Sequence, residues 1–595
     1  MIEKKLITIF INGRKIKAER GQTILEVANE NKIFIPSLCY HSDLKVKASC
    51  RLCVVEIKNK NGLVTACSTK IEPEMNVITN SPEIRKARKI NLGLLFSQHK
   101  EECHDCVWSK NNCQLLQLAK KYKVEITKFD DRKKNYPAYQ FGPAVLFDSS
   151  KCIDCRNCVE VCQNQGVGFL EIEEKGRLFQ VVPSKEKNKD CVYCGQCITH
   201  CPVGAFEGVG EFEDIVRLSS LQVAKSLERK DKVLIVQFAP SIRTSIGEEF
   251  GMPFGRVVTG KIVAGLKKLG FDKVFDTSTG ADFTTFEESR EIIERLEAGK
   301  NLPIMTSCCP AWVRYIEIYY PEFVPNLTTV RSPQIILGGL IKTYWAEKQG
   351  INPKKIVVVS IMPCVAKKYE ITRPELRING LRPVDYVLTT RELSRLFKKK
   401  NIGFSRLKPK KVDKAFDEPS GAGIIYGASG GVMESAFRTT YEKLSGQKLE
   451  KIEFEEIRGM AGIKKAAVKI GDENRYLAVI SGLGNAKQIL EEVKKGDIKY
   501  DCLEVMACPG GCIGGGGQPM PINEKIRKAR AQGLYSIDDK KKIRRAHENP
   551  VLQKIYNNFL DRNKEFSRQI LHTFYSPKKK SKIKKIVQTN LKLTN

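Results

Sequence analysis

Cysteine is the residue type whose number and spacing could do chemistry in this sequence. The chain has 21 cysteines among 595 residues, and they occur in groups, with none between positions 202 and 307. Thiolates bind iron–sulfur clusters and zinc, and grouped thiolates in a protein of a reducing compartment indicate metal rather than disulfides. The distribution therefore predicts several metal centres.

The most specific pattern is a repeat, C-x2-C-x2-C-x3-C, which begins at Cys152 and again at Cys191. Three cysteines at two-residue gaps surround three corners of a cubane, and the fourth in each run binds the other cluster. Zinc is the alternative, but zinc sites rarely use eight cysteines in this crossed register. We therefore expect two [4Fe–4S] clusters. Their ligands are Cys152, Cys155, Cys158 and Cys201 for one, and Cys162, Cys191, Cys194 and Cys197 for the other.

Another group of four cysteines lies nearer the N-terminus, with gaps of ten, two and thirteen residues that differ from the plant ferredoxin spacing. It predicts a further metal centre, with zinc again the alternative. Its ligands would be Cys39, Cys50, Cys53 and Cys67.

The next group has only three thiolates, Cys103, Cys106 and Cys113, so a fourth ligand is needed. His99 lies one helical turn before Cys103 and can face the same way, so we expect it to bind. An imidazole in place of a thiolate should raise the cluster potential. His104, inside the same loop, is the competing candidate.

Three cysteine-bearing stretches remain beyond residue 210. They are TSCCPAW (306–312), MPCVAKKYE (362–370) and EVMACPGGCIGGGGQP (504–519). Neighbouring side chains diverge, so Cys308 and Cys309 can rarely bind one centre and are expected to differ in role. The glycines after Cys512 lack a following Lys-Ser/Thr, which excludes a P-loop and favours close backbone approach to a bound group.

The elements that must position these groups change in type along the chain. Residues 5–17 alternate around Asn12-Gly13 and predict a hairpin, and Thr23 caps the helix that follows, which together suggest a β-grasp module. Residues 80–145 and 521–576 have helical patterns. From about residue 230, buried strands alternate with helices, which predicts α/β architecture.

The predicted fold class is thus multidomain, α+β and α/β. It would comprise a ferredoxin-like β-grasp domain, a small helical domain with one His and three Cys ligands, a bacterial-type 2[4Fe–4S] domain and a large α/β domain. The last residues form a basic tail that we expect to be disordered. The expected boundaries are 1–80, 81–145, 146–209, 210–520, 521–576 (the C-terminal segment) and 577–595 (the tail).

The formal net charge is +33. No helix-turn-helix or aromatic-interleaved basic motif accompanies it, so nucleic-acid binding is not expected. A lysine-rich solvated surface or a surface that steers an acidic redox partner would account for it. The sequence has no apolar run long enough to span a membrane and no signal-peptide pattern, so the expected location is the cytoplasm.

Together the cysteine groups and the three distal stretches make residues 1–576 resemble the [FeFe]-hydrogenases. The group at 39–67 is also similar to the [2Fe–2S] module of clostridial members and of the large iron–sulfur subunit of respiratory complex I. The resemblance implies an H-cluster, a [4Fe–4S] cluster joined to a two-iron subsite with CO, CN⁻ and a bridging amine-dithiolate. The implied ligands are Cys309, Cys364, Cys508 and Cys512, with Cys512 as the bridge.

The resemblance also assigns a proton route. Cys308 would exchange protons with the amine, which suits a thiol because its ordinary pKa of about 8.5 is near the operating pH. Glu288, Glu291 and Thr328 would continue the route toward water; the family often has Ser at the last position, and Thr keeps the hydroxyl while stiffening χ1. The alternatives are an inert buried thiol at Cys308 and an ordinary solvated helix face for the two glutamates.

Further residues match the family's surroundings of the two-iron subsite. Lys367 would contact one cyanide, although a surface lysine is the alternative. Ala239, Pro240 and Ser241 would contact the other cyanide. The residues expected to pack around the subsite are Met362, Met506 and Gln334. Ala311 stands where many members have Gly.

The implied function is a cytoplasmic hydrogenase that catalyses 2H⁺ + 2e⁻ ⇌ H₂. It would use one [2Fe–2S] cluster, three accessory [4Fe–4S] clusters and an H-cluster built by maturation proteins, and exchange electrons with ferredoxin. The main alternative is the hydrogenase subunit of a NAD(P)-linked, electron-bifurcating complex with a flavoprotein partner. A hydrogen sensor and a non-catalytic iron–sulfur scaffold are weaker alternatives, because Cys308 and the complete H-cluster set are present.

Overall fold

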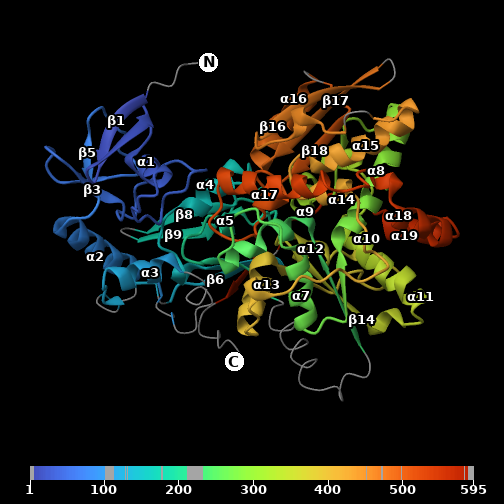
Figure 1. Ribbon diagram of the computed structural model, residues 1–595, viewed down its shortest axis with the longest axis horizontal. Helices are drawn as coiled ribbons and strands as arrows, with labels where there is room; N and C mark the ends of the chain where they lie inside the picture. The colour runs from blue at the N-terminus through green and yellow to red at the C-terminus, as the bar shows by residue number, and fades with distance from the viewer. Residues whose placement is uncertain are drawn as a thin grey trace.

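In the computed structural model, cysteine-bearing modules from the first part of the chain lie against a large α/β unit, residues 232–520 (Figure 1). The structure describes residues 6–100, 103, 113–126, 129, 132–133, 135–175, 178–210, 232–449, 452–470, 473–496, 499–581 and 583–586.

The N-terminal module is a five-stranded sheet in the order β2-β1-β5-β3-β4 with helix α1 beside it. The predicted hairpin is confirmed: β1 and β2 pair antiparallel, and Asn12 and Gly13 both have positive φ, as the tight turn requires. Thr23 caps α1 in a capping box with Glu26. The element bounds are β1 Leu6–Ile11, β2 Arg14–Glu19, α1 Ile24–Glu30, β3 Val54–Ile57, β4 Leu63–Thr65 and β5 Asn76–Ile78.

The prediction that residues 80–145 are helical holds only for the first part of that range. Helices α2 (Pro82–Phe96) and α3 (Gln114–Lys121) form there, but β6 (Ala138–Phe141) is a strand. It pairs with β7 (Val145–Asp148) because its buried side chains, among them that of Phe141, complete an aromatic core.

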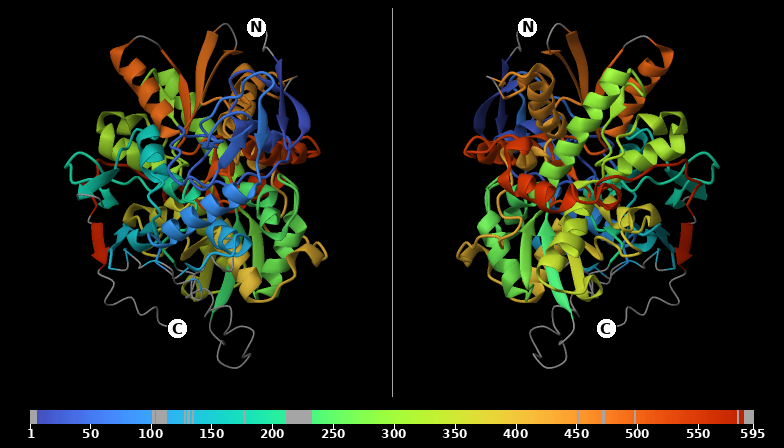
Figure 2. Two further views of the ribbon diagram at one scale, coloured as in Figure 1. Left: turned by 90° about the vertical axis from the view of Figure 1, so that its left-hand side faces the viewer. Right: turned by 90° about the vertical axis from the view of Figure 1, so that its right-hand side faces the viewer.

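The expectation of a disordered tail is wrong for residues 583–586. They form β19 (Ile583–Ile586), antiparallel to β6 at the edge of a sheet of order β10-β7-β6-β19, where β10 is Phe206–Gly208. In Figure 2 this C-terminal strand, in red, lies beside the blue-green strands. The tail is held because β6 is otherwise an edge strand with unpaired backbone groups.

The repeat occupies its own two-helix module. Helices α4 (Asn157–Asn164) and α5 (Gln196–Thr199) each start after a residue in the left-handed region, Arg156 and Gly195 respectively. Each helix begins one residue before the third cysteine of its motif, so the two halves place their thiols alike. A hairpin of β8 (Leu170–Lys175) and β9 (Leu178–Pro183) lies between them in the chain.

The α/β unit has two sheets, which confirms the predicted alternation of buried strands and helices. One is wholly parallel, in the order β12-β11-β14-β15, and the other has the order β13-β18-β17-β16. Cysteine-bearing or other candidate site residues follow the carboxyl ends of β11, β13, β14 and β18, which is where α/β sheets bind ligands. The bounds are β11 Val233–Phe238, β12 Lys273–Asp276, β13 Ile304–Met305, β14 Ile356–Met362, β15 Tyr386–Thr389, β16 Ile463–Ile470, β17 Glu473–Ser481 and β18 Cys502–Met506.

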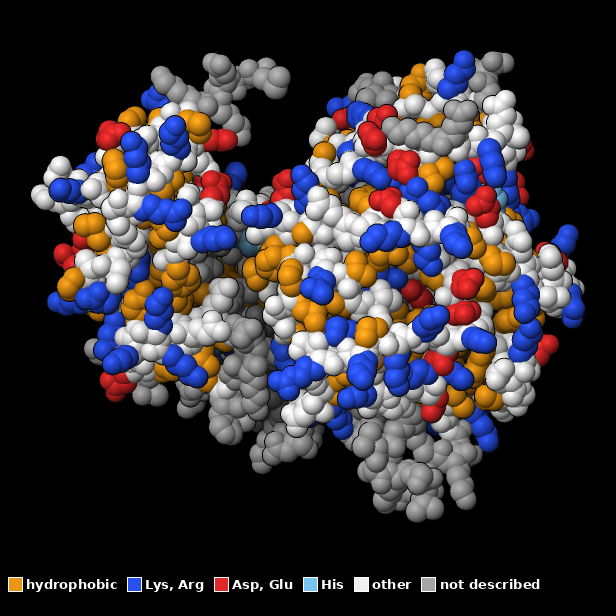
Figure 3. Space-filling model, viewed as in Figure 1, with side chains coloured by type: hydrophobic (Ala, Val, Ile, Leu, Met, Phe, Trp, Pro, Cys, Tyr) orange, Lys and Arg blue, Asp and Glu red, His pale blue; other side chains and the backbone are white. Residues whose placement is uncertain are grey.

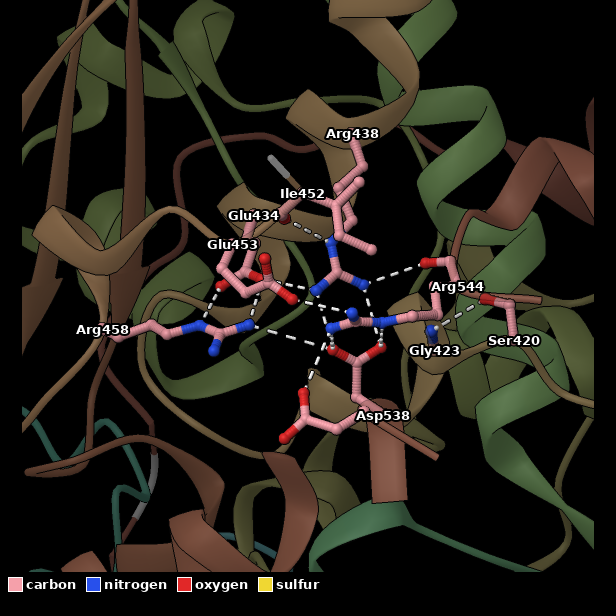
Figure 4. Close-up of polar contacts among 10 residues, drawn as sticks. Ser420, Gly423, Glu434, Arg438, Ile452, Glu453, Arg458, Asp538 and Arg544 are labelled. Carbon is pink, nitrogen blue, oxygen red and sulfur yellow. Dashed lines mark hydrogen bonds and ion pairs between the residues drawn. The ribbon is translucent and has the colours of Figure 1, made fainter. Parts of the chain in front are cut away.

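The C-terminal segment wraps around the α/β unit as α17 (Glu524–Asp538), α18 (Pro550–Ile555) and α19 (Lys564–Leu571) (Figure 2). Figure 4 shows what fixes it: Asp538, at the end of α17, accepts from Arg438 at 2.8 and 3.0 Å and from Arg544. Arg438 comes from α15 (Gly431–Ser445) and is fully buried with Glu434. Among the described residues, no helix has the length and apolar character needed to cross a membrane.

Candidate active site

Four of the distal cysteines converge at the meeting point of the two sheets. Cys309 caps α9 (Pro310–Tyr319), Cys364 follows β14, Cys508 follows β18, and Cys512 begins a short 3₁₀ turn. Burial raises the pKa of Cys364 to about 12, and the nearby Cys309 thiol adds to that rise. Burial and the same two neighbours also raise the pKa values of Cys508 and Cys512. A bound metal ion stabilises such a crowded set of thiols as thiolates.

The two adjacent cysteines do diverge. Cys309 packs against the core that carries the repeat module, whereas Cys308 packs against a separate cluster with Tyr426 and Met506. Burial raises the pKa of Cys308 well above its ordinary value, and the Glu288 charge adds to this. Cys308 is therefore a neutral thiol in electrostatic contact with Glu288.

Glu288 lies on α8 (Thr277–Ala298), 1% exposed, and accepts a hydrogen bond from Thr328 Oγ1 at 3.1 Å. Thr328 Oγ1 is 2.9 Å from Ser307 Oγ, next to Cys308 in the chain. Burial raises the pKa of the Glu288 carboxyl to about 8, and the Glu291 charge adds to the rise. Cys308, Glu288 and Thr328 are thus brought together by three different segments.

Glu291, one turn further along α8, takes its hydrogen bonds from a residue that the sequence did not single out. Thr329 donates to it from its backbone nitrogen at 2.9 Å and from Oγ1 at 3.0 Å. Arg295 forms an ion pair with it. Thr328 and Thr329 thus donate hydrogen bonds to Glu288 and Glu291 respectively. In the sequence, only the second hydroxyl next to Thr328 could have indicated the role of Thr329.

Lys367 is part of a buried polar chain rather than a surface lysine. Its Nζ donates to the Cys308 carbonyl at 3.1 Å and to Glu370 at 2.9 Å, and Glu370 also accepts from Gln334 Nε2 at 2.5 Å. Burial alone would lower the pKa of Lys367, but the Glu370 carboxylate outweighs it and raises the pKa. Sequence reasoning missed Glu370, although its position three residues after Lys367 on α12 (Ala366–Glu370) is a helix-pair spacing.

The remaining predicted residues surround the same region. Met362 and Met506 are the last residues of β14 and β18, each 3% exposed. Pro240 and Ser241 begin the 3₁₀ turn after β11. Among the described residues, Ser241 Oγ and Gln334 Oε1 are buried and have no hydrogen-bond partner.

Gln518 is a third residue that sequence reasoning missed. Its Nε2 donates to the Cys512 carbonyl at 3.1 Å, while its Oε1 accepts from Ser245 at 2.7 Å and from Thr390 at 3.0 Å. It thereby fixes the backbone of the Cys512 loop to two other segments.

The repeat module contacts this site directly. Cys508 Sγ is 3.8 Å from the Cys194 carbonyl oxygen, and Gln196 Nε2 donates to the Gly514 carbonyl at 3.2 Å. Gly195 and Gly516 face each other so closely that a Cβ on Gly516 would lie 2.7 Å from the Gly195 Cα. Two glycines therefore let the two cysteine-bearing loops meet backbone to backbone.

Within the repeat module, the thiols fall into the two predicted groups. Cys158 interacts electrostatically with Cys152, Cys155 and Cys201, and Cys197 with Cys162, Cys191 and Cys194. The two groups lie next to each other, because Cys158 also interacts electrostatically with Cys197.

The N-terminal group also converges. Hydrogen bonding from Cys50 lowers the pKa of Cys39 to about 5, and Cys53 bonds similarly with Cys67. The Cys39 charge in turn raises the pKa of Cys155, so this group lies near the repeat module.

The single-histidine group is described in part. His99 is buried, and its Nδ1 lies 2.7 Å from the Lys151 carbonyl oxygen, which requires Nδ1 to carry the proton and makes Nε2 the basic nitrogen. Cys103 and Cys113 are described, whereas Cys106 and His104 lie outside the described residues.

The thiol groups follow one another from the N-terminal module to the α/β unit, where they end beside Glu288, Cys308 and Lys367. This arrangement is that of an iron–sulfur oxidoreductase. Models of four protein families match the chain: iron only hydrogenase large subunit, C-terminal domain (232–516), 2Fe-2S iron-sulfur cluster binding domain (4–82), 4Fe-4S dicluster domain (151–205) and iron hydrogenase small subunit (524–578). The chain belongs to the [FeFe]-hydrogenase family, and it is an oxidoreductase that interconverts H₂ with protons and electrons.

Two curated relatives match over nearly their whole length. The chain is 41% identical to the NADP-reducing hydrogenase subunit HndD of Solidesulfovibrio fructosivorans and 39% identical to iron hydrogenase 1 of Clostridium pasteurianum, in each case over 96% of this chain and 99% of the relative. Among solved structures, a variant of apo [FeFe]-hydrogenase HydA1 from Chlamydomonas reinhardtii matches with a TM-score of 0.55 and 36% identity, covering 61% of this chain and 99% of that one.

Proposed function

We propose that Cys309, Cys364, Cys508 and Cys512 hold the H-cluster, with Cys512 as the bridge to the two-iron subsite. The observation that carries this proposal is the convergence of the four thiols, two of them buried, beside Cys308, Lys367 and Glu288. The cluster would supply the iron at which H₂ is made or split and the amine that exchanges the proton.

The residues around the thiols fit a group with diatomic ligands. Ser241 Oγ and Gln334 Oε1 are buried and unpartnered within the described structure, which is costly unless a bound group satisfies them. Lys367 adds a buried positive charge where cyanide ligands would bring negative charge. Met362 and Met506 would pack on the subsite as soft apolar side chains.

The chain's own residues would move the proton. On the way out from the two-iron subsite, the Cys308 thiol would be the first proton carrier. Glu288, which burial keeps protonated near neutral pH, would be the second. Thr328 donates to Glu288, and its hydroxyl also meets Ser307. Glu291 follows one turn along α8 and reaches a water-facing cavity of about 440 Å³.

The accessory groups would form an electron route. We propose a β-grasp [2Fe–2S] domain with ligands Cys39, Cys50, Cys53 and Cys67, a His99-ligated [4Fe–4S] cluster, and two [4Fe–4S] clusters in the repeat module. The contact between Cys194 and Cys508 supports entry to the H-cluster through the second of these two clusters. Domain boundaries close to 80, 145, 209, 520 and 576 are part of this proposal.

The experiment is anaerobic co-expression with hydrogenase maturation proteins, followed by infrared spectroscopy and H₂ evolution from reduced methyl viologen. Bands of bound CO and CN⁻ together with evolution are expected. Bands without turnover would contradict the proton route through Cys308.

We infer further that the electron partner is acidic, a ferredoxin or a flavoprotein subunit of a NAD(P)-linked complex, in a reducing compartment such as the cytoplasm. The 101 Lys and Arg side chains exceed the 68 Asp and Glu, and blue predominates over red on the face in Figure 3. The relative named as a NADP-reducing hydrogenase subunit favours the second kind of partner. Electron transfer from reduced ferredoxin should slow as salt rises; a flat salt dependence would contradict this inference.

A further inference from the structure

The C-terminal segment brings a histidine side chain beside the hydrogen bonds of Glu291. Residues 571–573 lie antiparallel to residues 329–331: the Arg331 nitrogen donates to the Leu571 carbonyl at 2.7 Å, and the Thr573 nitrogen donates to the Thr329 carbonyl at 2.8 Å. These backbone bonds hold the His572 ring beside Thr329.

An unbroken series of hydrogen bonds runs from Glu291 through this ring. Thr329 Oγ1 donates to Glu291 Oε2 at 3.0 Å and lies 2.9 Å from His572 Nδ1. His572 Nε2 lies 3.0 Å from Glu287 Oε2, and Glu287 also accepts from Tyr556. The series leaves α8 at Glu291, crosses the C-terminal segment and returns to α8 at Glu287.

We propose that His572 is a proton-relay residue that carries protons between Glu291 and the water-facing cavity under α19, an inference that rests on the relay proposed above. The Thr329 hydroxyl has a single proton. When that proton points to Glu291, the Thr329 oxygen must accept from Nδ1–H, and Nε2 must donate to the Glu287 carboxylate, so the ring is an imidazolium. When it points to Nδ1, the ring is neutral and Glu291 holds the extra proton.

The step between these two arrangements is balanced. The Glu291 carboxyl O–H breaks as its proton passes to the Thr329 oxygen, the original Thr329 O–H breaks as its proton passes to Nδ1, and one N–H bond forms at His572. The Nε2 proton then leaves to water or to Glu287, and no electron moves. Protons travel the other way when H₂ is oxidised.

The surroundings suit a relay. The His572 side chain is 24% exposed and lines the cavity of about 440 Å³ with Glu287 and Glu291. Arg295 occupies Oε1 of Glu291 and Thr329 donates to its Oε2, so the hydrogen-bonded way out from Glu291 leads through Thr329 to the His572 ring. Burial alone would raise the pKa of Glu287, but hydrogen bonds from His572 and Tyr556 outweigh it and hold that pKa below its ordinary value, so Glu287 stays a carboxylate that attracts the proton. Arg290 and Arg568 also line the cavity.

The test uses the maturated full-length protein with His572→Ala and His572→Gln, assayed for H₂ evolution from reduced methyl viologen. The Gln variant can keep both side-chain hydrogen bonds and so preserves folding. We expect a fall in kcat of about 10²-fold in both variants, a larger solvent deuterium isotope effect, and a saturable recovery when free imidazole is added to the Ala variant. The matched control is His547→Ala, a C-terminal histidine that bonds Thr439 and lies outside the relay, and it should not respond to imidazole.

A second readout does not depend on turnover. If His572 accepts from Glu291, protonated Glu291 should accumulate on reduction of the Gln variant and give a carboxylic-acid infrared difference band that a Glu291→Gln second change removes. Turnover of both His572 variants within twofold of wild type overturns the proposal, as does a loss without imidazole recovery and without that band, which would mark a structural role. If Cys308→Ser and Glu288→Gln are also fully active, the relay itself fails; if only His572 is dispensable, the relay stands without it.

Discussion

Replacing Glu288 by Gln should make the protein more stable and less active. Burial holds the Glu288 pKa at about 8, against an ordinary value of 4.5. The folded protein therefore keeps this proton over a pH range in which the unfolded chain has released it. The free energy of unfolding must fall as pH rises from about 4.5 to about 8, and stay level above that.

The size of the effect follows from those two values. At pH 7, keeping Glu288 protonated costs about 3 kcal/mol relative to the unfolded chain, at 1.36 kcal/mol per pH unit. Gln has the same shape, still accepts from Thr328 and carries no such cost. For a unit as large as the α/β unit, the melting temperature should rise by about 5 °C at pH 7 and by almost nothing near pH 4.5. Turnover should fall about 10²-fold because an amide cannot pass the proton.

Calorimetric melting of wild type and Glu288→Gln at several pH values, with H₂ evolution in parallel, measures both effects. Glu291→Gln is the matched control, because Glu291 pairs with Arg295 and accepts from Thr329, so its neutral form should lower the melting temperature. A stability gain in Glu288→Gln that does not vary with pH, or full turnover, would refute the reasoning.

Three further changes test other parts of the site. Cys308→Ser should keep the CO and CN⁻ infrared bands but lose most turnover, because a hydroxyl is a far weaker acid; near-normal turnover would contradict its role. Gly516→Val should push the two cysteine loops apart and slow H₂ evolution driven by ferredoxin, with the contact to Gly195 too tight for any side chain; an unchanged rate would exclude that contact as the electron route. Arg438→Met should lower the free energy of unfolding by about 3–5 kcal/mol, seen in thermal melting, because Glu434 and Asp538 are then left buried without their partner; a change below 1 kcal/mol would mean that the network in Figure 4 is not what holds the C-terminal segment.

The grouping of the repeat thiols could be predicted from the sequence because three thiols of each group are close together in the chain. The repeat places three thiols within seven residues of each other, and the structure needs only one helix start per motif to group them. The hairpin and the capped helix near the N-terminus were predictable for the same reason. Asn12-Gly13 and the Thr23 capping box each depend on residues that are adjacent or three apart.

Residues whose partners are far away in the chain could not be predicted from the sequence. His572 meets Thr329 across 243 positions, and Gln518 meets Ser245 across 273. The four residues of β6 are too few to show a period, and its partner β19 comes from the far end of the chain, so the sequence pattern does not distinguish β6 from the helical region before it. In each case the deciding contact forms only when the tertiary fold brings the segments together.

In the proposed mechanism, the two adjacent cysteines separate proton transfer from electron transfer. Cys309 faces the repeat module, whose Cys194 loop touches Cys508. Cys308 faces Glu288 on α8, Thr328 donates to Glu288 from another segment, and Glu291 lies one turn further along α8. A peptide bond joins the two thiols, yet their side chains point into different clusters. In the proposed mechanism, electrons and protons therefore reach the reaction centre through different parts of the chain.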